Sequence, residues 1–150
     1  MVHQIRKVIE RNPNLRSTKI DASEVSYLCV ATFLKVDKWR DMPSFLCAIA
    51  MVRLQLAWAD GNVRSKLKWN LFSRSFWTFT IWENQKVMLR FFATGAHLKA
   101  MQSFTRWASE GARTVRWKST SRKIDWNLAF EKLQETPVVF PGGNSTTTSS

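Results

Sequence analysis

The sequence predicts one domain of the α+β class, and the periodicity of its apolar residues is the main evidence. The chain has 150 residues with 45% hydrophobic content, enough for one core of ordinary size. Some stretches alternate with a period of two and others repeat at helical spacing. They follow one another in the order β-α-β-β-α-β, with the second helix in two pieces. This order predicts the ferredoxin-like arrangement, with an antiparallel four-stranded sheet.

The first predicted strand covers Val25 to Val36. Val25, Tyr27 and Cys29 begin one face, and Ser26, Leu28 and Val30 begin the other. Neither face carries a charge, which is typical of a central strand covered on both sides.

A helix is predicted from Asp41 to about Trp58. Pro43 fits its first turn, where the missing N–H would be unpaired in any case. Apolar residues surround this helix on nearly every side, with Arg53 and Gln55 as the exceptions. Such a helix needs more cover than one sheet gives. An N-terminal arm, the C-terminal segment or a second subunit could provide it.

Strands two and three form a predicted hairpin, with a turn at residues 72–75. Strand two, Val63 to Leu71, has one apolar face and one basic face, so part of the sheet is expected to contact water. Strand three, Phe76 to Trp82, has large side chains on both faces and is expected to be central. Its first face holds Trp77, Phe79 and Ile81, and its second face holds Phe76, Thr78, Thr80 and Trp82.

Two helices are predicted next, and capping residues mark their ends. Asn84 can accept a hydrogen bond from the first turn, and Gly95 is a plausible stop. The second helix places His97 on an apolar stripe that reaches Ala108. Strand four then runs from Ala112 to Lys118, and Asp125 caps a last helix.

These elements divide the chain into four parts. Residues 1–22 are an N-terminal arm, 23–121 the ferredoxin-like domain, 122–141 a C-terminal helix and arm, and 142–150 a Gly/Ser/Thr tail expected to be disordered.

The composition of the chain limits the classes of partner that we expect. The formal charge of +12 suits a polyanion, but no nucleic-acid motif accompanies it, so we expect a basic surface and not a nucleic-acid partner. No apolar run approaches the roughly 20 residues of a membrane span, and no secretion signal is apparent. Cys29 and Cys47 suggest free thiols in the cytoplasm, and no metal-binding pair of ligands appears.

One string resembles a known family. W-T-F-T-I-W-E-N at Trp77 to Asn84, a helix of about ten residues, and G-A-H-L-K-A-M at Gly95 to Met101 are similar to the antibiotic biosynthesis monooxygenase-like families. These belong to the dimeric α/β-barrel superfamily and include spheroidene monooxygenase-like and uncharacterised bacterial members. The resemblance implies a homodimer in which two sheets pair into a barrel. It also implies an enzyme with either no cofactor or haem.

The candidate site combines residue chemistry with this resemblance. His97 could be a general base or a haem ligand, or it could be a partly buried structural histidine. Trp77, Trp82 and Trp69 could form a flat wall for a hydrophobic ligand, or they could be packing residues. Through the resemblance, Asn70 and Arg53 are candidates for an amide and a basic partner. We therefore predict a catalytic set of His97, Trp77 and Asn70, and a ligand-binding set of Trp82, Trp69 and Arg53.

The predicted function is a monooxygenase-like protein that binds or acts on a flat hydrophobic molecule. The alternatives are a non-catalytic ligand-binding protein of the same fold and a module that binds polyanions through the basic face of strand two.

Overall fold

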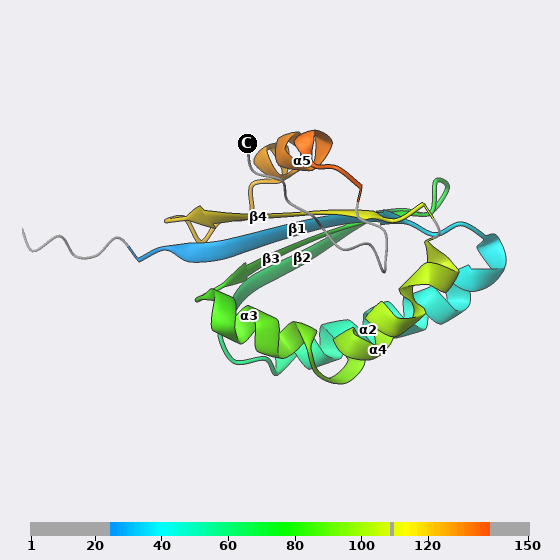
Figure 1. Cartoon of the computed structure of the whole chain (residues 1–150), viewed down its shortest axis with the longest axis horizontal. Coiled ribbons are helices and arrows are strands. Elements are labelled where there is room, and N and C mark those ends of the chain that lie inside the picture. The colour runs from blue at the N-terminus through cyan, green and yellow to red at the C-terminus, as the bar shows by residue number, and fades with distance from the viewer. Residues whose placement is uncertain (1–24, 109, 139–150) are drawn as a thin grey trace, which may run out of the picture.

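A computed structural model describes residues 25–108 and 110–138. The predicted arm at 1–22 and tail at 142–150 lie outside these residues. The four strands form one antiparallel sheet in the order β2-β3-β1-β4, which confirms the ferredoxin-like plan (Figure 1). Their bounds are β1 Tyr27–Lys35, β2 Asn62–Asn70, β3 Ser75–Trp82 and β4 Ala112–Ser119.

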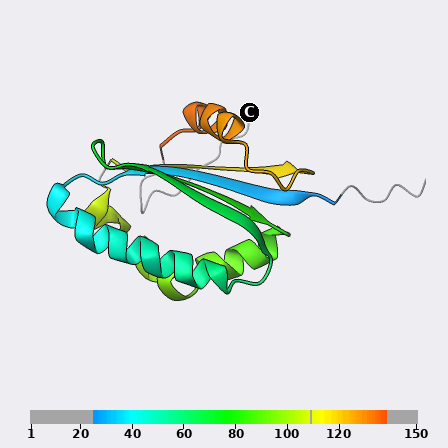
Figure 2. The same ribbon diagram turned by 180° about the vertical axis from the view of Figure 1, so that it is seen from behind.

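Helices cover both faces of this sheet (Figures 1 and 2). A 3-10 helix, η2 (Trp39–Asp41), leads into α2 (Met42–Ala57), which lies with α3 (Gln85–Phe92) and α4 (Gly95–Trp107) below the sheet. The last helix, α5 (Trp126–Glu135), packs on the opposite face. That face is therefore not open to a second sheet in this arrangement.

Two predicted caps form as expected. The Asn84 Oδ1 accepts a hydrogen bond from the Val87 N–H at 3.1 Å, and the Asp125 Oδ1 accepts one from the Leu128 N–H at 3.1 Å. Each cap satisfies a backbone donor that the first helical turn leaves unpaired.

The break between α3 and α4 differs slightly from the prediction. Helix α3 ends at Phe92, before the predicted stop, and Gly95 opens α4 with a positive φ of 63°. The Gln55 side chain explains this break. Its amide donates to the Thr94 carbonyl at 2.9 Å, and its oxygen accepts from the His97 N–H at 2.9 Å. The same amide also donates to the Phe91 carbonyl of α3 at 3.4 Å, so this polar exception on α2 satisfies backbone groups at both helix ends.

A turn glycine fixes the connection from α2 to β2. Gly61 has a φ of 80°, and a β-carbon there would lie 2.6 Å from the Val87 Cγ2. Only glycine fits this turn without displacing α3, because a side chain would be both strained and crowded.

The core differs between the two faces of the sheet. On the α5 face, Cys29, Ala31, Phe79 and Ile81 join Ala129 and Leu133 of α5 in one cluster. The face toward α2, α3 and α4 carries two separate clusters. One contains Val30, Leu56, Trp82, Met88 and Phe91, and the other contains Val36, Met42, Phe45, Phe76 and Trp107.

The outer side of α2 stays uncovered by the described residues. Leu54 is 56% exposed and Trp58 is 83% exposed. Cover of this apolar side by a terminal segment or by a second subunit stays a prediction. No helix in residues 25–108 and 110–138 is long and apolar enough to cross a membrane.

Candidate functional site

A pocket of about 560 Å³ lies between α2 and β2. Apolar side chains make up most of its lining, together with the two cations Arg53 and Lys66. The full lining is Leu46, Ile49, Ala50, Arg53, Lys66, Leu67, Trp69 and Leu71. It is therefore a hydrophobic site with positive charge beside it.

The local structure explains why these residues meet. Leu67 and Trp69 pair with Thr78 and Phe76 of β3, so they share the sheet face that α2 covers. On α2, Leu46, Ile49, Ala50 and Arg53 recur every three or four residues and so share one side of the helix. The edge position of β2 leaves Trp69 58% exposed, so its ring is accessible beside the pocket.

Arg53 favours ligands that carry a negative charge. Its guanidinium is charged at every physiological pH and offers donors in a planar fork. An apolar cavity beside such a group suits a hydrophobic molecule that carries a carboxylate. Trp69 and Arg53, two of the three predicted ligand-binding residues, are thus brought together.

Trp82 is not part of this pocket. It is fully buried between the sheet and the helices, with its ring centroid 5.1 Å from that of Phe91. Its indole Nε1 donates to the Thr80 Oγ1 at 2.9 Å. These contacts make Trp82 a core residue with a satisfied polar group.

Trp77 lies on the opposite face of the sheet. Its ring centroid is 5.2 Å from that of Phe33 and 6.1 Å from that of Phe130 on α5. The predicted wall of three tryptophans is therefore not assembled within this chain, because successive side chains on a strand alternate between faces.

Asn70 ends β2 at the hairpin. Its Oδ1 accepts a hydrogen bond from the Ser73 N–H at 3.2 Å, which stabilises the turn. Among the contacts of the described residues, none joins Asn70 to His97 or to Trp77.

His97 lies near the opposite edge of the sheet. Its ring stacks on Phe92 at 4.5 Å with an interplanar angle of 10°. Its Nδ1 is 3.3 Å from the Phe92 carbonyl oxygen, which can only accept, so Nδ1 carries the proton. Burial lowers the pKa of His97 below 6.5, although the Phe92 hydrogen bond opposes this shift. The imidazole is therefore neutral near pH 7.

Haem ligation by His97 stays a prediction, because a haem ligand would bind through Nε2 in the plane of the ring. Phe92 covers one face of its ring, and His97 is not among the lining residues of the pocket between α2 and β2. Within the part of the chain that the structure describes, no group of three His, Cys, Asp or Glu side chains could hold a metal ion.

A row of threonines is the feature that sequence reasoning missed. Thr32 pairs with Thr78 on one side and with Thr114 on the other, on the face toward α2, α3 and α4. The Thr32 and Thr114 hydroxyls are hydrogen-bonded at 3.2 Å, and all three residues are half-buried. The register continues the row to Leu67 at the pocket. Their signal was the presence of hydroxyls at inward positions of β1, β3 and β4.

Neither a protein-family model nor a curated protein matches the sequence. Solved structures do match the fold. A putative antibiotic biosynthesis monooxygenase from Nitrosomonas europaea aligns with a TM-score of 0.55 and 18% identity, over 63% of this chain and 90% of that one.

Two further structures share the fold. A conserved protein from Methanosarcina mazei Go1 aligns with a TM-score of 0.55 and 7% identity, over 63% of this chain and 93% of that one. The protein PA3566 from Pseudomonas aeruginosa aligns with a TM-score of 0.54 and 13% identity, over 63% and 94%. The chain thus has the fold of antibiotic biosynthesis monooxygenase-like proteins, as its strand-helix string indicated.

Proposed function

We propose that the protein binds a flat hydrophobic molecule with an acidic group in the pocket between α2 and β2. The carrying observation is the exposed ring of Trp69 beside an apolar pocket of about 560 Å³ that also holds Arg53. A large exposed aromatic side chain next to a cavity gains stability by stacking on a ligand, and a nearby guanidinium selects an anion.

A fluorescence titration tests this proposal. We expect 1-hydroxy-2-naphthoate to quench tryptophan emission in a saturable way. Arg53→Met should weaken binding by about 10- to 100-fold, because a hydrogen bond to a charged group contributes about 1.5–3 kcal/mol. Trp69→Leu should remove most of the quenching.

Two controls separate this site from non-specific binding. Trp58→Leu removes an exposed ring outside the pocket, and Lys86→Met removes an exposed charge on α3. Both should leave the affinity unchanged. Equal affinities for wild type and Arg53→Met would overturn the proposal.

Oxidation of the bound molecule is the second candidate function. The monooxygenase-like fold is the observation that favours it. Oxygen uptake after addition of 1-hydroxy-2-naphthoate, compared between wild type and Arg53→Met, measures oxidation at this pocket, and His97→Gln tests the predicted role of His97. Binding without uptake would leave the protein a non-catalytic ligand carrier.

The haem hypothesis depends on His97 alone. A haem titration followed by Soret absorbance, on wild type and His97→Ala, tests it directly. A Soret shift that His97→Ala abolishes would support ligation through Nε2, and no shift in the wild type would overturn the haem hypothesis.

A homodimer remains part of the proposal, as does a cytoplasmic location. The exposed apolar side of α2, with Leu54 and Trp58, supports association with a second copy. Light scattering of wild type and Leu54→Asp would detect it. The polyanion alternative stays a prediction: Arg64, Lys66 and Lys68 of β2 are exposed, and the Lys68 ammonium lies over the α5 rings of Trp126 and Phe130 at 4.9 and 5.4 Å.

A further inference from the structure

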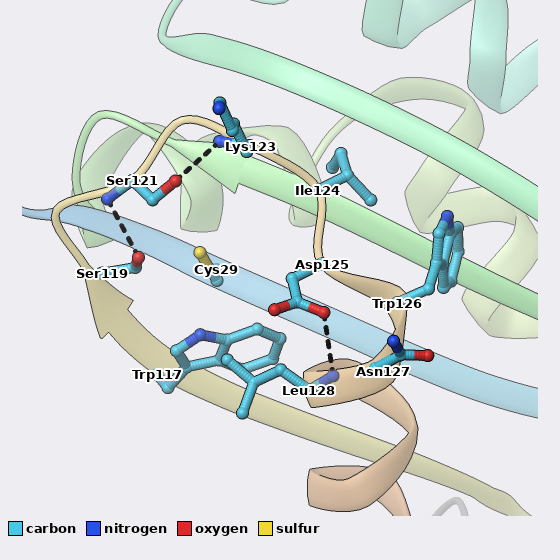
Figure 3. A pocket seen from close by; sticks show the side chains of 10 residues that line it. All are labelled: Cys29, Trp117, Ser119, Ser121, Lys123, Ile124, Asp125, Trp126, Asn127 and Leu128. Carbon is cyan, nitrogen blue, oxygen red and sulfur yellow. Dashed lines mark hydrogen bonds between the residues drawn. The ribbon is translucent and has the colours of Figure 1, made fainter.

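A second pocket, of about 490 Å³, opens on the α5 face of the sheet (Figure 3). Trp117 of β4 and Trp126 of α5 are its aromatic members, Cys29 of β1 lies at its base, and the segment from Ser119 to Asp125 borders it. None of the residues predicted as site residues lines it. It lies across the sheet from the Arg53 pocket.

The two tryptophans are held in place by ring contacts. Phe79 meets Trp117 edge-to-face at 5.2 Å and Trp126 edge-to-face at 5.8 Å. Trp126 also stacks with Phe130 at 5.7 Å. Because each indole has a fixed partner, the pocket presents preorganised aromatic surfaces, which lowers the entropy lost on binding.

The loop beside the rings is also ordered by hydrogen bonds. The Ser121 N–H donates to the Ser119 Oγ at 3.0 Å, and the Lys123 N–H donates to the Ser121 Oγ at 3.1 Å. In Figure 3 the Lys123 side chain points away from Asp125. Lys123 and Asp125 are thus the two charged residues of the lining, and Asp125 is the anion of the two.

Asp125 has one oxygen in use and one available. One carboxylate oxygen caps α5 by accepting from the Leu128 N–H at 3.1 Å. The other points toward Cys29 in Figure 3 and has no hydrogen bond among the contacts of the described residues. An ionised carboxylate only accepts, so it selects a donor or a cation.

We infer that this pocket binds an aromatic amine, with its ring against Trp117 and Trp126 and its ammonium on the free oxygen of Asp125. The Lys132 and Lys68 ammonium groups already lie over the Trp117 and Trp126 rings, at 5.6 and 4.9 Å, so Asp125 and not the ring faces selects the ammonium of the ligand. We thus expect the two pockets to prefer ligands of opposite charge. Two ligands that share one aromatic ring but carry an ammonium or a carboxylate group distinguish the pockets.

Calorimetric titration of the full chain with tryptamine and with indole-3-propionate tests this inference. Tryptamine should bind wild type at least 10-fold more tightly than it binds Asp125→Asn. The asparagine keeps a cap oxygen for Leu128, so the melting temperature should stay within about 2 °C of wild type. Trp117→Leu should also weaken tryptamine binding.

Three comparisons make the test decisive. Asp60→Asn, at an exposed turn, should bind tryptamine as wild type does. Arg53→Met should also keep tryptamine binding while it loses 1-hydroxy-2-naphthoate, so failure of one pocket is distinguishable from failure of the other. Equal tryptamine affinity for wild type and Asp125→Asn, or its loss in Arg53→Met, would overturn the inference.

Discussion

The two faces of the sheet are made by the same four strands, yet they pack in different ways. The face toward α2, α3 and α4 has two apolar clusters with half-buried threonines at its middle. The α5 face has one cluster, and aromatic rings contact each other throughout it. The face with more helices is therefore the more divided one.

The sizes of the covering side chains explain this difference. Helices α2 and α4 bring Phe45 and Trp107 to one end of the sheet, and α3 brings Met88 and Phe91 to the other. The middle of the sheet is left to hydroxyl groups. The fully buried residues of the short helix α5 are Ala129 and Leu133, and its Trp126 and Phe130 rings pack with Phe79 and Trp77 of β3.

The faces also differ in charge. The charged lining residues are Arg53 and Lys66 in the pocket on the first face, and Asp125 and Lys123 in the pocket on the second. A chain with a net charge of +12 can therefore still offer a site for a cation, because local groups decide binding at short range.

Trp82→Ala should have the largest effect on stability. The Trp82 ring is fully buried in one cluster with Val30 of β1 and with Met88 and Phe91 of α3. We therefore expect a loss of about 3–5 kcal/mol in the free energy of unfolding. Denaturant unfolding measures it. Trp69→Ala is the matched control, and its exposed ring should cost under about 1 kcal/mol. Similar losses for both would contradict the difference in burial.

Leu133→Ala should weaken the α5 face by about 2–4 kcal/mol. Because α5 contacts mainly β1 and β4, hydrogen exchange should rise first in α5 and leave β3 and α2 protected. Leu128→Ala, on the exposed side of the same helix, should have a much smaller effect. A uniform rise across the whole chain would show instead that the two faces unfold as one unit.

The smallest effect that we expect is on the pH dependence of stability, which one buried titratable group on each face of the sheet should influence. His97, on the first face, has a pKa below 6.5 because of burial. As the pH falls below 6.5, the unfolded chain takes up a proton that the folded protein refuses, so stability decreases. Burial raises the pKa of Cys29, on the α5 face, from 9.0 to about 11. As the pH rises above 9.0, the unfolded chain releases a proton that the folded protein keeps, so stability again decreases.

Melting curves from pH 5 to 10.5 measure both limbs. His97→Gln should flatten only the acid limb, and Cys29→Ala should flatten only the alkaline limb. If neither variant changes its limb, other groups control the pH dependence.

Much of the fold could be predicted because its signals are local. The caps at Asn84 and Asp125 form as their sequence positions indicate, and the alternation of β3 correctly assigns Trp77 and Trp82 to opposite faces. The site was predicted less well. Trp69 and Arg53 meet at one pocket, but Trp82 is core and His97 stacks on Phe92 at the other edge.

The sequence by itself determined the order of the elements, the side of each strand on which a residue lies, and the caps that begin two helices. These features depend on neighbours within a few positions, so short patterns specify them. Only the tertiary structure decided that α5 covers the free face, that Gln55 binds the junction of α3 and α4, and that Asp125 faces two tryptophans. Such contacts join residues distant in the chain, and their geometry follows from how the layers pack.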